Sequence, residues 1–73
     1  MTAEEWVRRF AAEVGAEAPS DEELDRILKL AAIAAHGSER TAAPVACWIG
    51  GQTGRSAEEL RELAKGINPG AEE

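Results

Sequence analysis

The chain has 73 residues, and its 14 Asp and Glu outnumber its 8 Lys and Arg to give a formal net charge of −6. This length leaves room for one small domain and no second, substrate-binding lobe. The acidic balance argues against a nucleic-acid binder, because phosphate contacts need clustered Lys and Arg side chains. The single Cys cannot form an internal disulfide, and with the single His it cannot complete a Cys/His zinc site.

No apolar run approaches the roughly 20 residues that a membrane-spanning helix needs. No basic and then apolar leader with a cleavage site opens the sequence. We therefore expect a soluble cytoplasmic protein that uses no membrane, nucleic acid, metal or cofactor.

Three Ser/Thr-x-x-Glu boxes mark helix starts along the chain. In such a box the hydroxyl accepts a hydrogen bond from the third helical amide, and the glutamate accepts one from the amide of the cap residue. Each box is followed by apolar residues at helical spacing and later by a glycine. The boxes predict three helices, and they pair Thr2 with Glu5, Ser20 with Glu23, and Ser56 with Glu59.

The first predicted helix covers about residues 3–14 and ends before Gly15, which suits a left-handed cap. Its apolar stripe includes Trp6 and Phe10. The second helix covers roughly residues 21–35 and is apolar over more than one face, so neighbours must cover it from more than one side. We expect this helix to be the central element, with the other helices packed against it.

The segment 41–54 has the least regular pattern. Pro44 suits the first turn of a third helix, where its missing N–H is no loss. Apolar residues then continue at helical spacing to Ile49. Gly50 and Gly51 each weaken a helix by roughly 1 kcal/mol relative to alanine. They are expected either to end this helix or to let another backbone come close.

A fourth helix is predicted over about residues 57–65, and no alternating run of β-branched residues indicates a strand. We therefore predict an all-α, compact bundle of four short helices, with a single helical domain at 1–67 and a flexible tail at 68–73. Trp6 and Trp48 are expected in its core, and an exposed tryptophan would mark an interface. Because so small a core barely offsets the ordering entropy, we expect a second copy or another protein to complete the apolar surface.

The middle of this acidic chain is locally basic. Residues 26–55 carry four basic side chains and one acidic side chain, and they also hold the only His and the only Cys. His36, at the end of the second helix, either satisfies that helix end or joins Arg40 in holding an anion. Arg55 precedes the fourth helix, whose first amides can hold one anion weakly. The candidate binding residues are His36, Arg40, Pro44, Trp48 and Arg55.

No catalytic residues can be assigned from the pattern. Cys47 lies beside Trp48 in an apolar segment and is expected to pack as a small hydrophobic residue. The glutamate pairs lie in first helical turns, where capping and the helix dipole explain them. We therefore predict that the chain is not an enzyme.

The run at residues 35–44, AHGSERTAAP, follows an apolar helix and is accompanied by Trp6 near the N-terminus. This pattern resembles a small actinobacterial helical domain of unknown function, in which an Ala-His pair is followed by Arg-Pro-Ala-Ala-Pro. Thr41 stands where that pattern has proline. Members of this family occur alone or fused to molybdenum-cofactor guanylyltransferases. The resemblance implies an accessory role near molybdopterin guanine dinucleotide synthesis, and its motif falls on Ala35, His36, Arg40, Ala42, Ala43 and Pro44.

Two functions from different classes remain open. The first is a non-catalytic interaction module that docks on a molybdenum-cofactor nucleotidyltransferase or on a second copy of itself as a homodimer. The alternative is a small anion- or nucleotide-binding module that uses His36, Arg40 and Arg55. An enzyme acting alone and a helix-turn-helix DNA binder are less favoured, because neither a nucleophile–base pair nor a basic recognition helix is present.

Overall fold

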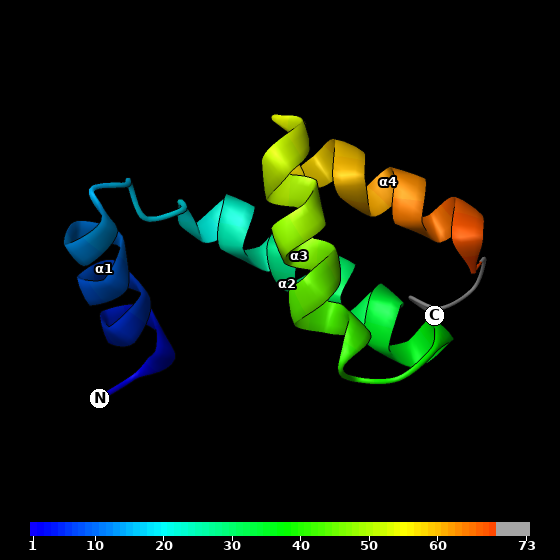
Figure 1. Ribbon diagram of the computed structural model, residues 1–73, viewed down its shortest axis with the longest axis horizontal. Helices are drawn as coiled ribbons and strands as arrows, with labels where there is room; N and C mark the ends of the chain where they lie inside the picture. Colours follow the sequence, from blue (N-terminus) through cyan, green and yellow to red (C-terminus); the bar gives the residue numbers. More distant parts are fainter. Residues whose placement is uncertain (69–73) are drawn as a thin grey trace.

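The computed structural model describes residues 1–68. This part of the chain contains four helices and no strand (Figure 1). In chain order they are α1 (Ala3–Val14), α2 (Asp21–Gly37), α3 (Ala42–Thr53) and α4 (Ala57–Ile67). The predicted all-α fold of four short helices is confirmed. In this part of the chain no helix is both long enough and apolar enough to span a membrane.

Local sequence sets the starts of α1, α2 and α4. Thr2 and Ser20 each form a complete capping box, in which hydroxyl and glutamate satisfy two backbone amides over 2.9–3.1 Å. The amide and hydroxyl of Ser20 both hydrogen-bond Glu23 and lower the pKa of its carboxyl. The Ser56 hydroxyl likewise accepts a hydrogen bond at the start of α4, from the Glu59 amide at 3.1 Å. All three predicted hydroxyl caps are therefore present. The reciprocal glutamate bond is found in the first two boxes, whereas the Glu59 carboxylate pairs with Arg55.

The glycine pair in α3 does not end the helix. Pro44 lies in the first turn, as predicted, but α3 continues through Gly50 and Gly51 and ends at Gly54, whose φ is 73°. Gly50 is buried because Leu60 of α4 lies over it, and a Cβ added at Gly50 would be 2.7 Å from Leu60 Cδ1. The glycine therefore permits a close approach, by a side chain rather than by another backbone.

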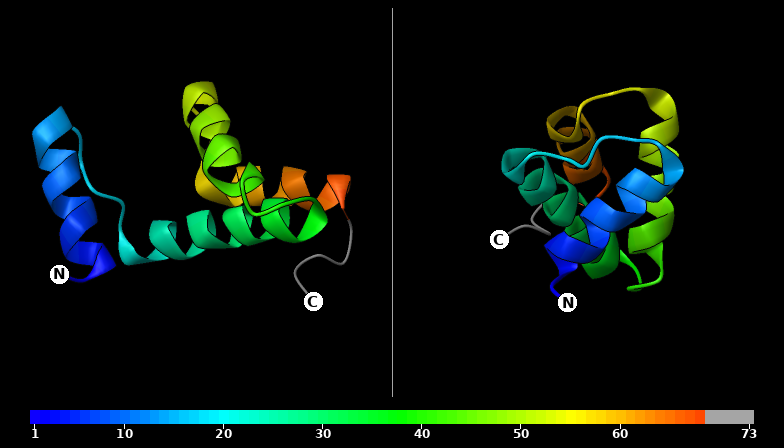
Figure 2. Two further views of the ribbon diagram at one scale, coloured as in Figure 1. Left: turned by 60° about the horizontal axis from the view of Figure 1, so that its bottom comes forward. Right: turned by 90° about the vertical axis from the view of Figure 1, so that its left-hand side faces the viewer.

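The helix α2 forms the base on which α3 and α4 pack. Figure 2 shows α3 rising from α2 while α4 runs beside it. Among the residues described, the buried apolar side chains are Leu30 and Ile33, both on α2, and Ile33 is fully buried. The expected central position of the second helix is confirmed for α3 and α4.

Two polar contacts fasten α4 to α2. The Arg26 guanidinium forms an ion pair with Glu58. Beyond the end of α4, the Asn68 side chain donates from Nδ2 to the carbonyl oxygen of Ile33 at 3.1 Å. Asn68 belongs to the predicted tail, yet it is tied to α2. The rest of that predicted tail, 69–73, lies outside the described residues.

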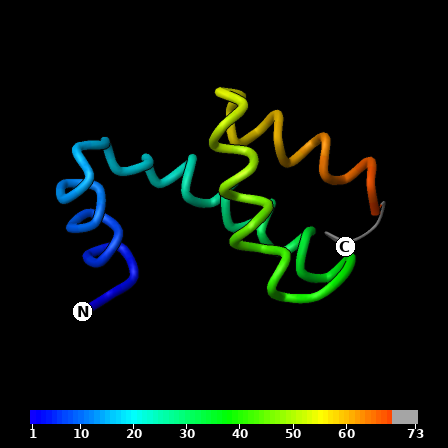
Figure 3. Tube along the Cα trace, viewed as in Figure 1, coloured from blue at the N-terminus to red at the C-terminus, as the bar shows by residue number. Residues whose placement is uncertain are grey.

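The helix α1 stands apart from α3 and α4 (Figures 1 and 3). Gly15, with φ at 76°, ends α1 and begins the turn that leads to α2. At this corner Val7 lines one small hollow with Pro19 and Leu24. The expectation that the first helix also packs against the second is therefore wrong for the described residues: α3 and α4 pack on α2, whereas α1 reaches its first turn at this corner.

Neither tryptophan lies in the core. Trp6 is 57% exposed on α1 and Trp48 is 66% exposed on α3, so the prediction that both are buried is wrong. The reason is geometric: α1 stands apart from α3 and α4, and Trp48 lies two residues from the buried Gly50, roughly on the opposite side of α3. Because an exposed tryptophan is expected to mark an interface, both residues are candidates for interface residues.

Candidate functional site

His36 and Arg40 lie at the turn that joins α2 to α3. Both residues are exposed, His36 in the last turn of α2 and Arg40 just before α3 begins. The Ser38 hydroxyl donates to the Ala34 carbonyl at 2.7 Å and so satisfies part of this helix end. His36 and Arg40 thus lie on either side of the turn that joins α2 to α3.

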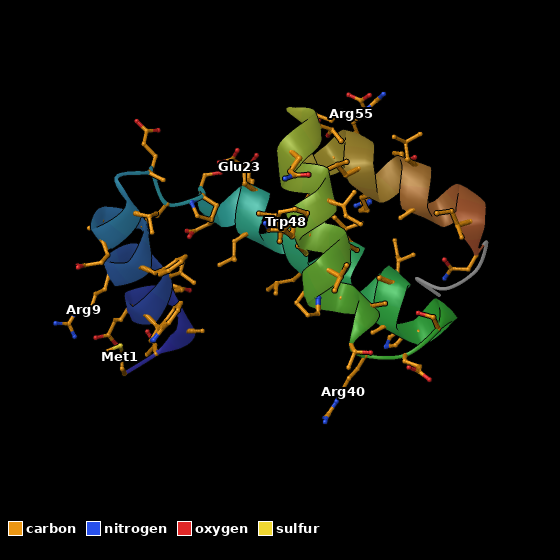
Figure 4. All side chains as sticks on the ribbon, in the orientation of Figure 1. Met1, Arg9, Glu23, Arg40, Trp48 and Arg55 are labelled. Atoms are coloured by element: carbon orange, nitrogen blue, oxygen red, sulfur yellow. The ribbon has the colours of Figure 1, made fainter. Side chains whose placement is uncertain are left out.

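Arg55 lies at the other end of α3. Figure 4 shows Arg40 and Arg55 extending from opposite ends of this helix. Twelve helical residues separate them, a rise of roughly 18 Å. The Arg55 guanidinium also forms an ion pair with Glu59 in the first turn of α4. Arg40 and Arg55 therefore do not converge on one small anion, because α3 separates them.

Pro44 and Trp48 lie on the exposed side of α3, and Trp48 is labelled in Figure 4. Val45, between them, is also more than half exposed. We call these three residues, Pro44, Val45 and Trp48, the α3 stripe. It is an apolar ridge on a regular helix, with Arg40 beyond its N-terminal end.

The helices α2, α3 and α4 enclose an open apolar hollow of about 340 Å³, which we call the trough. Small residues, including Ala34, Ala46, Gly50 and Ala64, line it, and none of its lining residues is charged. Ile49 and Leu63 also line it and remain more than half exposed. Sequence reasoning missed this feature, although the small residues that recur along three helices were its signal.

Cys47 is half-buried on α3, and burial raises the pKa of its thiol. Because the thiolate is the nucleophile, less of it is present at neutral pH than in an unfolded chain. We expect iodoacetamide to label Cys47 several-fold more slowly in the folded protein than in the protein unfolded in urea, both at pH 7.5. Mass spectrometry measures the labelled fraction over time. Equal rates in the two states would contradict the packing role assigned to Cys47.

A family model for the Domain of unknown function (DUF6457) matches residues 1–72. The chain belongs to this family. Comparison with curated proteins and with solved structures gave no match. The α3 stripe, the trough and the run at 35–44 all lie within the matched DUF6457 region, so they belong to the domain itself.

Proposed function

We propose that this DUF6457 domain is a non-catalytic interaction module that docks on a protein partner through the α3 stripe. The exposure of Trp48 carries this proposal, because tryptophan supplies a large rigid contact area and is enriched among residues that dominate binding energy. Val45 and Pro44 extend the same apolar ridge. A regular helix holds all three, so little conformational entropy is lost on docking.

The charge beside the α3 stripe favours an acidic patch on the partner. Arg40 extends outward from the N-terminal end of α3 (Figure 4), where its guanidinium can pair with a carboxylate. Such a charge at the rim of an interface chiefly speeds association and fixes orientation, while the apolar centre supplies affinity. Arg40 and Trp48 therefore have different expected roles in one surface.

As the partner we propose a nucleotidyltransferase of molybdenum-cofactor assembly, the protein class that the resemblance of residues 35–44 implies. Arg40 and Pro44 belong to that run, and both lie at the N-terminal end of the α3 stripe. The residues that carry the resemblance thus adjoin the surface that is suited to docking, which supports one role for both.

Titration calorimetry of the domain against a purified molybdenum-cofactor guanylyltransferase tests the proposal. We expect binding in the micromolar range, weakened at least about 10-fold by Trp48→Ala. Leu28→Ala is the matched control, because Leu28 is also largely exposed (60%) but lies on the side of α2 opposite Leu30. Absence of binding would overturn the choice of partner, and equal loss in both variants would overturn the role of the α3 stripe.

A further inference from the structure

We infer that two copies of this chain associate, each docking the apolar stripe of its α1 in the trough of the other. The α1 stripe consists of Trp6, Phe10 and Val14, at positions i, i+4 and i+8 of one helix. This surface is distinct from the α3 stripe, so the inference goes beyond the proposed function and does not depend on it.

The side chains of the α1 stripe are exposed, and two of them stack on each other. The rings of Trp6 and Phe10 stack with centroids 5.2 Å apart and planes 19° from parallel. All three members of the stripe are more than half exposed. A neighbouring face of α1, which includes Val7, lies at the corner with Pro19 and Leu24. Val7 thus lies at the corner, while the aromatic side chains of α1 are exposed on another face.

The trough is complementary to that stripe. Its lining is uncharged, so it can take apolar side chains without desolvating a buried charge. Its volume of about 340 Å³ falls within the range of pockets that hold bulky apolar groups. Small residues such as Ala46 and Ala64 leave depth in the trough, and large exposed residues, Leu63 and Ile67, stand along it. Large side chains on α1 therefore match small ones in the trough.

The exposed area also fits a dimer. The chain exposes 5532 Å², whereas a compact monomer of 7.8 kDa exposes about 4,400 Å². The excess is on the order of 1,000 Å², and a standard protein interface removes about 800 Å² from each partner. One interface between two copies would therefore bring the exposed surface to the level of an ordinary folded protein.

A second copy fits better than closure of α1 onto its own trough. The part of α2 that lines the trough is its C-terminal half, from Leu30 to Gly37. The linker from α1 enters α2 at the opposite, N-terminal end of α2. Self-closure would have to undo the corner at Pro19. A separate chain can dock without that change, and because each copy has one stripe and one trough, a two-fold arrangement fills both.

Sedimentation equilibrium of the full chain from about 1 to 200 μM tests the inference. We expect a monomer–dimer equilibrium for the wild-type chain. Combining Trp6→Ala with Phe10→Ala should raise the dimer dissociation constant at least about 10-fold and leave the far-ultraviolet circular dichroism spectrum unchanged. Leu28→Ala, at a comparably exposed apolar residue outside the stripe and the trough, should leave the equilibrium unchanged. A wild-type monomer over the whole range, or a dimer that survives the double substitution, would overturn the inference.

Mixing two variants identifies the docked surfaces. Ala46→Phe fills the trough and keeps the stripe, whereas the double variant lacks the stripe and keeps the trough. Each alone should be monomeric, and the mixture should form a heterodimer that is weaker than the wild-type dimer, because it keeps one of the two stripe–trough contacts. Ala64→Phe offers a second trough-filling variant if Ala46→Phe does not fold. No heterodimer from any folded pair would overturn the inference.

The outcomes separate this inference from the proposed function. A monomeric chain that still binds the nucleotidyltransferase through Trp48 would overturn the α1–trough dimer alone. A dimer with the predicted stripe dependence, but without nucleotidyltransferase binding, would support the inference and overturn the proposed partner. The Trp48→Phe variant leaves Trp6 as the tryptophan whose fluorescence is measured. If this variant is monomeric and its emission shows that Trp6 is buried at all concentrations, α1 closes onto its own trough, and the dimer is overturned.

Discussion

Replacing Ile33 by alanine is expected to lower the free energy of unfolding by about 2–5 kcal/mol. Ile33 is fully buried on α2, at the floor of the trough between α3 and α4. Its removal would cost the transfer free energy of the lost methyl and methylene groups, and it would leave a cavity in a core that has few other buried side chains. Urea denaturation followed by circular dichroism at 222 nm measures the change.

Leu28→Ala is the control for Ile33→Ala, since Leu28 lies on the same helix and is 60% exposed. Its effect should stay within about 0.5 kcal/mol. Both variants should be compared at one protein concentration, because any dimer would add a concentration-dependent term to stability. Equal destabilisation at positions 28 and 33 would contradict the assignment of Ile33 to the core.

The helices could be predicted from the sequence because their starts are set locally. A hydroxyl at Thr2, Ser20 or Ser56 needs only the amide three residues later, and both lie in the same turn. No tertiary contact can alter that spacing. Which of the two roles expected for Gly50 and Gly51 applies could not be decided locally, because Gly50 lies inside α3 against Leu60, ten residues further along.

Burial could not be predicted in the same way. The spacing of Trp6 and Phe10 shows that one face of α1 is apolar, but it does not say which chain covers that face. Alanines on a helix such as α2 allow a neighbour to approach closely, but they do not require it. In the structure, Ala34 and small residues of α3 and α4 instead line an open trough. Apolar and small residues at helical spacing are expected both for an exposed stripe with a trough and for an ordinary buried core. The sequence pattern therefore does not distinguish the two.

The grouping of Arg55 with Arg40 could not be judged from the sequence, because charge along the sequence does not establish proximity. Arg40 and Arg55 lie in the same basic segment, but the rigid length of α3 separates them. Trp48, first assigned to the core, proved to be the most exposed tryptophan. The sequence therefore indicates the segment that holds the candidate residues, but it does not indicate which of them share a surface.

Alanine at Gly50 and at Gly51 is expected to have opposite consequences, although the two residues are adjacent in α3. Gly51 is exposed, and a Cβ built there meets nothing within 4 Å. Gly51→Ala should therefore gain the helix propensity of alanine and stabilise the protein by about 0.5–1 kcal/mol.

At Gly50 the same gain is offset by overpacking, since the added methyl group would lie 2.7 Å from Leu60 Cδ1. Leu60 would have to leave its place over α3 and disturb the wall of the trough. We expect Gly50→Ala to be about 1–3 kcal/mol less stable than Gly51→Ala, measured by urea denaturation at one protein concentration. Equal stabilisation by both substitutions would mean that Leu60 moves aside without cost, and Gly50 would then have no special role in how α4 meets α3.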